Sequence, residues 1–379
     1  MIAVTAGTAP SPVRPSPAAT AATPPTPEPR EGTETVNLLT TSRLRLHRAC
    51  PRQHWYRYEM GRVPVAAESS ALAFGTAIHA ALEAWWKTWQ TLDGIGALEA
   101  ARDALPVDTD PYAAATAHAL VIAYHARWAR WAAGVEVLGV ETAFAAPLHC
   151  PTTGRAARTW QIAGKLDGLL RLQDGRVAIL EHKTTSSDAR SGSDYRRRLT
   201  LDPQVGTYFE GCEALGTPAE VCVWDVLSKP AIRPLKATGE IKLRKDGQPR
   251  AGQRLSDETP EEYQARLITA LGETGPEGAL AHVEVHRLAP ERETHRWALW
   301  HTVREIEATR EAVARTGDVR AVPQNGDACT RYGSPCPYLP VCEGTASIAD
   351  DTRYRRLPVI HAELSADMQH DTLKTRKAA

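Results

Sequence analysis

Residues 164–184 read GKLDGLLRLQDGRVAILEHKT, two apolar-rich runs of strand length that flank a short polar stretch at 173–175. An Asp-Gly pair between two such runs is a strong signal for a β-hairpin. A two-residue loop would place Asp167 opposite His182, whereas a three-residue loop with its glycine in the left-handed conformation would place Asp167 opposite Glu181. Only the second register gives one polar and one apolar face, and a slip of one residue would mix them. The sequence therefore predicts the three-residue loop.

In this register one face of the hairpin carries Asp167, Glu181 and Lys183. The opposite face carries four leucines, which are Leu166, Leu170, Leu172 and Leu180. Two carboxylates beside an ammonium group suit metal-assisted phosphate chemistry, because the carboxylates can hold Mg²⁺ or Mn²⁺ and the lysine can orient or deprotonate the attacking water. The alternative is a solvated hairpin face on which a glutamate and a lysine form a weak ion pair.

A histidine lies on a predicted helix upstream of the hairpin. The apolar spacing predicts this helix over about Leu72 to Leu92, with His79 on its inward stripe. The stripe also contains Gly75, Leu82, Trp86 and Trp89. An inward histidine is either a structural core residue or, beside the hairpin carboxylates, a ligand that suits Mn²⁺.

A second predicted helix follows the hairpin. Asp202 is suited to its N-cap and Pro203 to its first position, which places Gln204 and Tyr208 one turn apart on the same face. The pair is either part of an ordinary amphipathic helix with a partly buried tyrosine, or it supplies polar groups to the site on the hairpin.

Four of the seven cysteines form a pattern typical of a metal centre. Cys329, Cys336 and Cys342 are close together in the sequence, and Cys50 lies near the start of the predicted folded region. A disulfide framework is typical of small secreted domains, so clustered thiolates in this chain favour zinc or an iron–sulfur cluster. The paired Cys-x-x-Cys knuckles of many zinc sites do not occur. The other three, Cys150, Cys212 and Cys222, are predicted to be ordinary free thiols.

The hairpin and the two helices together resemble the PD-(D/E)XK nuclease superfamily, in its RecB-like branch. That branch has an Asp on one strand and a Glu-x-Lys on the next, matched by Asp167, Glu181 and Lys183. An upstream helix carries Gly-Thr-x-x-His, matched at 75–79, and a downstream helix carries Gln-x-x-x-Tyr, matched at 204–208. All of these motifs occur here in the order of the branch.

Further positions bear on the resemblance. Val140-Glu141 is similar to a Val-Glu often found on the preceding strand, and Lys165-Leu166-Asp167 replaces the name-giving Pro-Asp, whose proline is frequently absent in the branch. The resemblance implies two sets of residues. The catalytic residues are Asp167, Glu181, Lys183, Gln204 and Tyr208, and the metal ligands are His79, Asp167, Glu181 and His182, which stands between the Glu and the Lys.

The cysteine pattern resembles the iron–sulfur staple of AddB-type helicase–nucleases and CRISPR-associated RecB-like exonucleases. There a [4Fe–4S] cluster joins one N-terminal cysteine to a C-terminal group of three. Five residues between Cys336 and Cys342 agree with these relatives, whereas the six between Cys329 and Cys336 are more than the two common there. The resemblance implies that Cys50 and these three hold the cluster, with Zn²⁺ or unrelated buried thiols as the alternatives.

Composition excludes a global basic field. The chain has 379 residues with 45 basic and 45 acidic side chains, so any DNA-binding surface must consist of local patches. One candidate patch is Arg190 with the arginines at 196–198. Another interleaves basic and aromatic side chains that could hold phosphates and stack bases, namely Arg52, Arg57 and Arg62 with Trp55, Tyr56 and Tyr58. The alternative for each is a solvated loop or an ordinary amphipathic helix.

Composition also divides the chain. Residues 1–36 are rich in Pro, Ala and Thr and are predicted to be a disordered leader, residues 37–345 to form the nuclease-like domain with an insertion near 236–257, and residues 346–379 to be a charged, flexible tail. No signal peptide or membrane span is evident, so we expect a cytoplasmic protein without a membrane partner.

The predicted fold is α/β, a restriction-endonuclease-like mixed central sheet flanked by helices, with an iron–sulfur-stapled helical portion. Strands are expected near 135–146, 160–172, 176–184, 220–228 and 281–288, and helices near 111–133 and 291–315 in addition to the two that carry the motifs. A helix with a capping box should begin at 259–262.

The expected function is that of a Mg²⁺- or Mn²⁺-dependent DNA nuclease. An exonuclease acting on free ends in recombination, repair, phage-type replication or CRISPR adaptation is the favoured form. The sequence contains no Gly-x-x-x-x-Gly-Lys-Ser/Thr phosphate loop, so a helicase or recombinase would be a separate partner. The alternatives are a non-catalytic DNA-binding or scaffold subunit of a helicase–nuclease complex, and a zinc-stabilised protein whose hairpin carboxylates are incidental.

Overall fold

The computed structural model describes residues 36–364, apart from 66–69, 107–109, 240, 243, 248–249, 251–252, 274–278, 332–333 and 363. The predicted leader, except for Val36, and the tail beyond residue 364 therefore lie outside the described residues.

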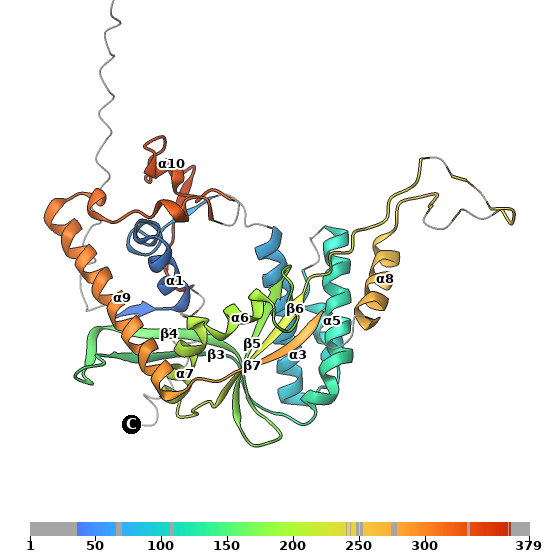
Figure 1. Cartoon of the computed structure of the whole chain (residues 1–379), viewed down its shortest axis with the longest axis horizontal. Helices are drawn as coiled ribbons and strands as arrows, with labels where there is room; N and C mark the ends of the chain where they lie inside the picture. Colours follow the sequence, from blue (N-terminus) through green and yellow to red (C-terminus); the bar gives the residue numbers. More distant parts are fainter. Residues whose placement is uncertain are drawn as a thin grey trace, which may run out of the picture.

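A mixed β-sheet lies at the centre of the described residues (Figure 1). Its strands are β1 (Asn37–Leu39), β3 (Glu136–His149), β4 (Ala156–Arg171), β5 (Val177–Thr185), β6 (Val221–Ser228) and β7 (Leu280–Val285). The hydrogen-bonded order is β1-β4-β5-β6-β7, and β3 also pairs with β4. The pairs β1–β4 and β5–β6 are parallel and the others are antiparallel. The predicted mixed sheet is confirmed, and its five predicted strands are all present.

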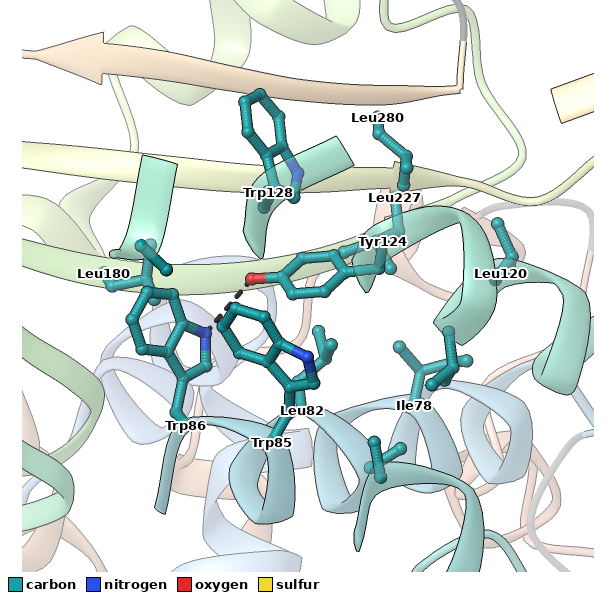
Figure 2. Packing of buried hydrophobic residues seen from close by; sticks show 14 of the residues in the cluster. Ile78, Leu82, Trp85, Trp86, Leu120, Tyr124, Trp128, Leu180, Leu227 and Leu280 are labelled. Carbon is teal, nitrogen blue, oxygen red and sulfur yellow. Dashed lines mark hydrogen bonds between the residues drawn. The ribbon is translucent and has the colours of Figure 1, made fainter. Parts of the chain in front are cut away.

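Three helices cover one face of the sheet. They are α3 (Ser70–Leu92), α4 (Ala97–Asp103) and α5 (Pro111–Ala132), which begins with Asp110 as N-cap. Figure 2 shows the core between them and the sheet, where Trp86 donates a hydrogen bond from Nε1 to the hydroxyl of Tyr124 at 3.1 Å. These large aromatic side chains are fully buried, so the helix carrying His79 is fixed rigidly against the sheet.

Two shorter helices, α6 (Asp194–Thr200) and α7 (Pro203–Ala214), cover the other face. Their apolar side chains pack with Ile179, Cys222 and Trp224 of β5 and β6. Both faces of the hairpin strands are thus covered by helices, and the polar residues of the predicted site are confined to one end of this packing.

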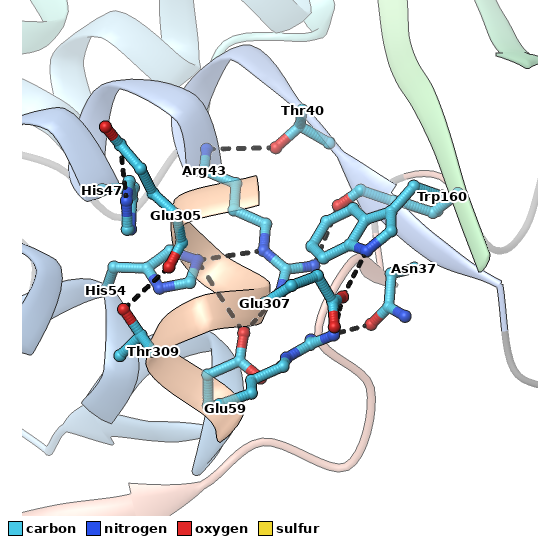
Figure 3. Close-up of polar contacts among 12 residues, drawn as sticks. Asn37, Thr40, Arg43, His47, His54, Glu59, Trp160, Glu305, Glu307 and Thr309 are labelled. Atoms are coloured by element: carbon cyan, nitrogen blue, oxygen red, sulfur yellow. Dashed lines mark hydrogen bonds and ion pairs between the residues drawn. The ribbon is translucent and has the colours of Figure 1, made fainter. Parts of the chain in front are cut away.

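The N-terminal segment packs against the long helix α9 (Ala289–Thr316). It consists of α1 (Thr41–Ala49), α2 (Pro51–His54) and the π-helical turn η1 (Trp55–Glu59). Figure 3 shows its central contacts: Arg43 donates from Nε to His54 Nε2 at 3.1 Å and from Nη2 to Glu59 Oε1 at 2.6 Å. Glu59 also accepts from Arg310 of α9 at 2.8 Å. Burial alone would raise the pKa of Glu59, but Arg43 and Arg310 outweigh it and lower the pKa.

Chain segments from both ends of the described residues meet in a C-terminal lobe. It contains η2 (Val319–Ala321), η3 (Gly326–Ala328), α10 (Leu339–Cys342) and β8 (Tyr354–Arg356). Strand β8 pairs with β2 (Arg62–Pro64), which follows the N-terminal helices in the chain. Ile348, Tyr354 and Leu364 are buried. The chain thus continues to pack on the fold beyond the predicted boundary at residue 345, as far as Leu364.

The predicted insertion near 236–257 leaves the sheet as an extended arm beside α8 (Pro260–Glu273) (Figure 1). Within its described residues, Thr238 N donates to Arg254 O at 3.0 Å and Arg250 N to Lys242 O at 3.1 Å, which is a hairpin-like pattern. Thr259 and Glu262 form the predicted capping box, because each backbone N–H donates to the other's side chain at 3.2 Å.

Candidate active site

The β4–β5 hairpin has the predicted register. Arg171 pairs with Val177 and Gly168 with Leu180, so Asp167 and Glu181 stand next to the last pair of the ladder. Gly175 has φ +89° in the loop, a backbone conformation that costs glycine little. The three-residue loop is therefore confirmed, and it brings Asp167 and Glu181 to neighbouring positions at the end of the ladder.

Glu181 is the most constrained residue of the site. It is 2% exposed, and its Oε1 accepts hydrogen bonds from Lys183 Nζ at 2.8 Å and from Gln204 Nε2 at 2.5 Å. Its Oε2 is buried and has no hydrogen-bond partner. A buried carboxylate oxygen without a partner is costly, so this oxygen is suited to a cation.

The ionisation of the site reflects two buried carboxylates side by side. Burial and the neighbouring Asp167 raise the pKa of Glu181 to about 7. Burial opposes the charge of Lys183, but Glu181 outweighs that effect and raises the lysine's pKa. The pKa of Asp167 is lowered despite burial, because His79, His182 and Lys183 favour its charged form. A divalent cation would favour the charged form of Glu181 as well.

His79 reaches the hairpin from α3. Its Nδ1 lies 3.6 Å from Asp167 Oδ2, and its side chain is 34% exposed. His79 therefore faces the sheet, where its ring also lies 5.9 Å from that of the buried His182, but it is not fully buried there. Its position beside Asp167 is what the ligand interpretation requires. One turn earlier, a Cβ added to Gly75 would lie 3.2 Å from Thr184 Oγ1, so glycine lets α3 approach β5 closely.

Gln204 and Tyr208 hold the site from α7. Asp202 caps this helix by accepting from Gln204 N at 2.8 Å. Besides its bond to Glu181, the Gln204 amide accepts from Lys183 Nζ at 3.2 Å and donates to the Tyr208 hydroxyl at 2.7 Å. Tyr208 in turn donates to Lys165 O on β4 at 2.8 Å. The chain of contacts fixes the positions of Glu181 and Lys183, and Tyr208 is itself buried.

Glu141 adds a third carboxylate next to Asp167. On β3 it stands between Val140, which pairs with Gly168, and Thr142, which pairs with Leu166. It forms an ion pair with Lys165 and has φ +53°, an uncommon backbone conformation for a residue with a side chain. Burial, with a contribution from Asp167, raises its pKa. In the sequence, the only indication of this position is the similarity of Val140-Glu141 to the Val-Glu of the family. That similarity does not by itself predict that Glu141 lies next to Asp167.

His182 does not join the carboxylates through its side chain. Successive strand residues point to opposite faces, and the buried imidazole contacts Asp225 Oδ2 through Nδ1 at 2.8 Å. Its backbone N–H donates to Asp167 Oδ2 at 2.8 Å. The prediction of His182 as a metal ligand is therefore corrected: it orients Asp167 through the backbone, and its imidazole belongs to a buried pair with Asp225.

The remaining residues fit a divalent metal in part. Asp167, Glu181 and His79 are the groups that would hold it, and the unpartnered Oε2 of Glu181 is the observation that supports the fit. Within the described ranges, no group of three or more His, Cys, Asp or Glu side chains is arranged to enclose a metal ion. Mg²⁺ usually keeps several waters, so such an incomplete set of protein ligands is ordinary for it.

Three of the predicted cluster cysteines lie in the C-terminal lobe, and Cys50, between α1 and α2, lies near them. Burial raises the pKa of Cys336 and Cys342, and both of these thiols interact electrostatically with Cys50 and Cys329. Cys336 N also donates to Cys329 O at 2.6 Å. The thiols thus share one neighbourhood, although they do not form a ligand cage in the portion that the structure describes.

The other cysteines and the aromatic patch have structural roles. Cys212 and Cys222 are fully buried in the core beneath α7, and Cys150 is half-buried. Trp55, Tyr56 and Tyr58 are also buried, so they cannot stack on exposed bases. The prediction that these three rings stack on bases is therefore wrong.

The arginines of both predicted patches have partners within the protein. Arg52 donates to Val322 O at 2.8 Å and Arg62 to Asp351 Oδ1 at 2.5 Å. On α6 and in the loop before it, Arg190 pairs with Asp188, Arg197 with Asp194, and Arg196 donates to Ala189 O. These contacts within the protein favour the solvated-loop alternative for the patch of Arg190 and the arginines at 196–198. Arg197 and Arg198 remain exposed at the surface.

Comparison with known proteins agrees with this geometry. A protein-family model described as "PD-(D/E)XK nuclease superfamily" matches residues 38–343 of the chain. The chain belongs to this superfamily, whose members are in general nucleases that use divalent metals.

Other comparisons add little. No curated protein matches the chain. A solved structure titled "Crystal structure of SSO0001" aligns with a TM-score of 0.25 and 9% identity, covering 67% of this chain and 83% of that chain, a likeness too low to carry an argument. None of the helices in the described ranges is long and apolar enough to cross a membrane.

Proposed function

We propose that the protein is a metal-dependent DNA nuclease whose site is built on Asp167, Glu181 and Lys183. The observation that carries the proposal is the position of Glu181: it is buried, it lies near a second carboxylate, Asp167, and one of its oxygens has no protein partner. A purely structural Glu–Lys pair on a solvated strand would have neither the burial nor the unpartnered oxygen.

Each residue of the site has a distinct role in this proposal. Asp167 and Glu181, with His79, would hold Mg²⁺ or Mn²⁺, which when bound supplies an activated water and neutralises charge on the phosphate. Lys183 keeps its ammonium charged and next to Glu181, where it orients the water or a phosphate oxygen. Gln204 holds both residues through one amide group, and Tyr208 holds Gln204.

The finer assignment is an exonuclease that acts on DNA with free ends. Its support is the resemblance of the His79, Gln204 and Tyr208 motifs to RecB-like exonucleases, together with the placement of all three around the carboxylates. Recombination, repair, phage-type replication and CRISPR adaptation are the contexts in which such an activity is needed. A helicase or recombinase would act as a separate partner.

We also propose that Cys50, Cys329, Cys336 and Cys342 bind a [4Fe–4S] cluster, with Zn²⁺ as the alternative. Support comes from the shared neighbourhood of the four thiols and from the way the lobe joins the N-terminal segment to residues beyond 319. Metal binding needs thiolates, so it would release protons and depend on pH. Burial strengthens this dependence at Cys336 and Cys342, because it raises the pKa of both thiols.

The test of the nuclease function uses end-labelled single- and double-stranded DNA with Mg²⁺ or Mn²⁺. Wild-type protein should shorten or cut at least one substrate, and Lys183→Ala should not. Binding without cleavage by the wild type would instead favour the non-catalytic DNA-binding or scaffold subunit. Release of mononucleotides would indicate exonuclease action, and release of internal fragments would indicate endonuclease action.

A further inference from the structure

A cavity of about 190 Å³ lies beside the active site, between the first turn of α1 and strand β4. Its polar lining comes mainly from Thr41, Ser42 and Arg45 of α1, Lys165 of β4 and Gln204 of α7. No acidic side chain lines it in the part of the chain that the structure describes. The cavity therefore combines hydroxyl groups, two cations and an amide, which is the chemistry of an anion site.

The first turn of α1 contributes backbone donors. Thr40 caps the helix, since its side chain accepts from Arg43 N at 3.2 Å and its carbonyl oxygen accepts from Leu44 N at 2.9 Å. The N–H groups of Thr41 and Ser42 precede these and have no acceptor within the helix. Together with the helix dipole they favour an anion at this end.

The side chain of Thr41 supplies an independent observation. The residue is 8% exposed and lines the cavity, and its Oγ1 is buried without a hydrogen-bond partner. A buried hydroxyl normally has a partner, because leaving one unsatisfied costs free energy. A ligand oxygen in the cavity would supply the missing partner.

Two cations face the same space. Arg45 follows Thr41 by one helical turn, and its Nη2 contacts both Asp202 and Gln204. The guanidinium carries five N–H donors, so it can hold Asp202 and an anion together. Lys165 is paired with Glu141, and it precedes Asp167 by two residues on β4. Asp202 and Glu141 are thus the acids that face these cations, and neither lines the cavity.

We propose that this cavity binds a phosphate group of the nucleic-acid strand whose neighbouring phosphodiester is cleaved at Asp167 and Glu181. The link between the two places is Gln204, whose side-chain oxygen lies 3.4 Å from Arg45 Nη2 while its amide nitrogen donates to Glu181. The proposal rests on the proposed nuclease function for its ligand, but not for the existence of a phosphate site. Both a terminal phosphate and a backbone phosphate have the required chemistry.

The first experiment measures inorganic phosphate binding to the full-length protein in metal-free buffer, by calorimetry and by the shift in unfolding temperature. Wild type should bind phosphate. Thr41→Val should weaken binding about 3- to 10-fold, the range expected for one hydrogen bond, and Arg45→Ala at least ~10-fold. Arg48→Ala is the matched control, because Arg48 is an exposed arginine of the same helix that does not line the cavity.

The unfolding temperature of Thr41→Val without phosphate shows whether Thr41 binds the ligand or stabilises the fold. Thr41→Val removes an unpartnered buried hydroxyl, so without phosphate its unfolding temperature should equal or exceed that of the wild type. With phosphate, the stabilisation seen for the wild type should be reduced. Because Arg45 also holds the cap residue of α7, Ser42→Ala serves as a second variant that leaves this contact intact.

The second experiment compares oligonucleotides with a 5′-phosphate and a 5′-hydroxyl. If the site takes a strand end, removing the 5′-phosphate weakens binding to the wild type more than binding to Thr41→Val. If it takes a backbone phosphate, the two oligonucleotides bind alike and Arg45→Ala lowers the salt dependence by about one ion.

The outcomes distinguish the subsite from the nuclease function. Phosphate binding that depends on Thr41 in a protein that cleaves no DNA would uphold the site and overturn the nuclease function. Equal binding by wild type, Thr41→Val and Ser42→Ala in every arm would overturn the site, whether or not the protein cleaves DNA.

Discussion

Asp167 and Glu181 adjoin the last pair of the β4–β5 ladder, Gly168 with Leu180, and the oxygen of Glu181 that is not held by Lys183 and Gln204 has no partner. Burial and the proximity of Asp167 raise the pKa of Glu181 to about 7. Without a cation the site is therefore electrostatically unfavourable when both carboxylates are charged.

Glu181 should make the metal-free protein less stable as the pH rises. A glutamate in the unfolded chain titrates near its ordinary pKa of about 4.3. The folded protein therefore binds more protons than the unfolded chain between about pH 4.3 and 7, so the free energy of unfolding falls with rising pH in that window. Glu181→Gln should raise the unfolding temperature at pH 8 in EDTA and have little effect at pH 4. Glu284→Gln, on the exposed part of β7, is the control.

Mg²⁺ or Mn²⁺ should reverse the loss of stability that the charge of Glu181 causes at high pH. A ligand that binds only the folded protein stabilises it in proportion to the logarithm of its concentration above Kd. Thermal unfolding at pH 8 with increasing Mn²⁺ should show a rise for the wild type and a much smaller one for Glu181→Gln. The same rise in both proteins would mean that the ion binds elsewhere.

His79 should affect the metal dependence more than the stability. Its side chain is partly exposed and lies beside Asp167, so His79→Ala removes little core packing. We expect the Mn²⁺ concentration for half-maximal cleavage to rise by ~10-fold, a scale seen when a metal site loses a supporting group. An unchanged metal titration together with a lower unfolding temperature would assign His79 to the structure alone.

Gln204 should act as a positioning residue. It holds Glu181 and Lys183 through one amide, and Gln204→Ala would release both. We expect kcat to fall by ~10- to 100-fold with little change in KM, since the interaction orients reacting groups. Tyr208→Phe, which removes only the hydroxyl behind Gln204, should have a smaller effect of the same kind. A change confined to KM would contradict this role.

Cys50 and the three cysteines of the C-terminal lobe should act as one unit. Serine at Cys50, Cys329, Cys336 or Cys342 should lower the soluble yield and remove visible absorption, because the cluster would join segments far apart in the chain. Cys150→Ser, at a half-buried cysteine away from the lobe, should do neither. Anaerobically purified protein should contain about four iron and four sulfide per chain. Stoichiometric zinc without iron would mean that the four cysteines bind Zn²⁺ in place of the cluster and still join the two segments of the chain.

Local rules predicted the hairpin correctly. Its register follows from the two-residue period of a strand and the left-handed glycine of the loop, both of which can be read from adjacent residues. The same period shows why His182 could have been excluded as a side-chain ligand, since it alternates with Glu181 and Lys183.

Tertiary packing decided what local rules could not. His79 lies on the apolar stripe of its helix, but the end of the sheet leaves it half-exposed beside Asp167. Trp55 and Tyr56 resemble a nucleic-acid patch in sequence, yet they are buried by Val313 and Tyr354, almost 260 and 300 residues further along the chain. The cavity beside α1 also joins distant segments, so no single motif indicates it.

The central claim is that Asp167 and Glu181 form the catalytic metal site. Its most direct test is the single-turnover cleavage rate of end-labelled DNA at saturating protein, with Mg²⁺ or Mn²⁺, for wild type, Asp167→Asn, Glu181→Gln and the control Glu284→Gln. We predict a loss of at least ~10²-fold for each of the first two variants and none for the control. Wild-type rates in a folded Asp167→Asn or Glu181→Gln protein would contradict the account.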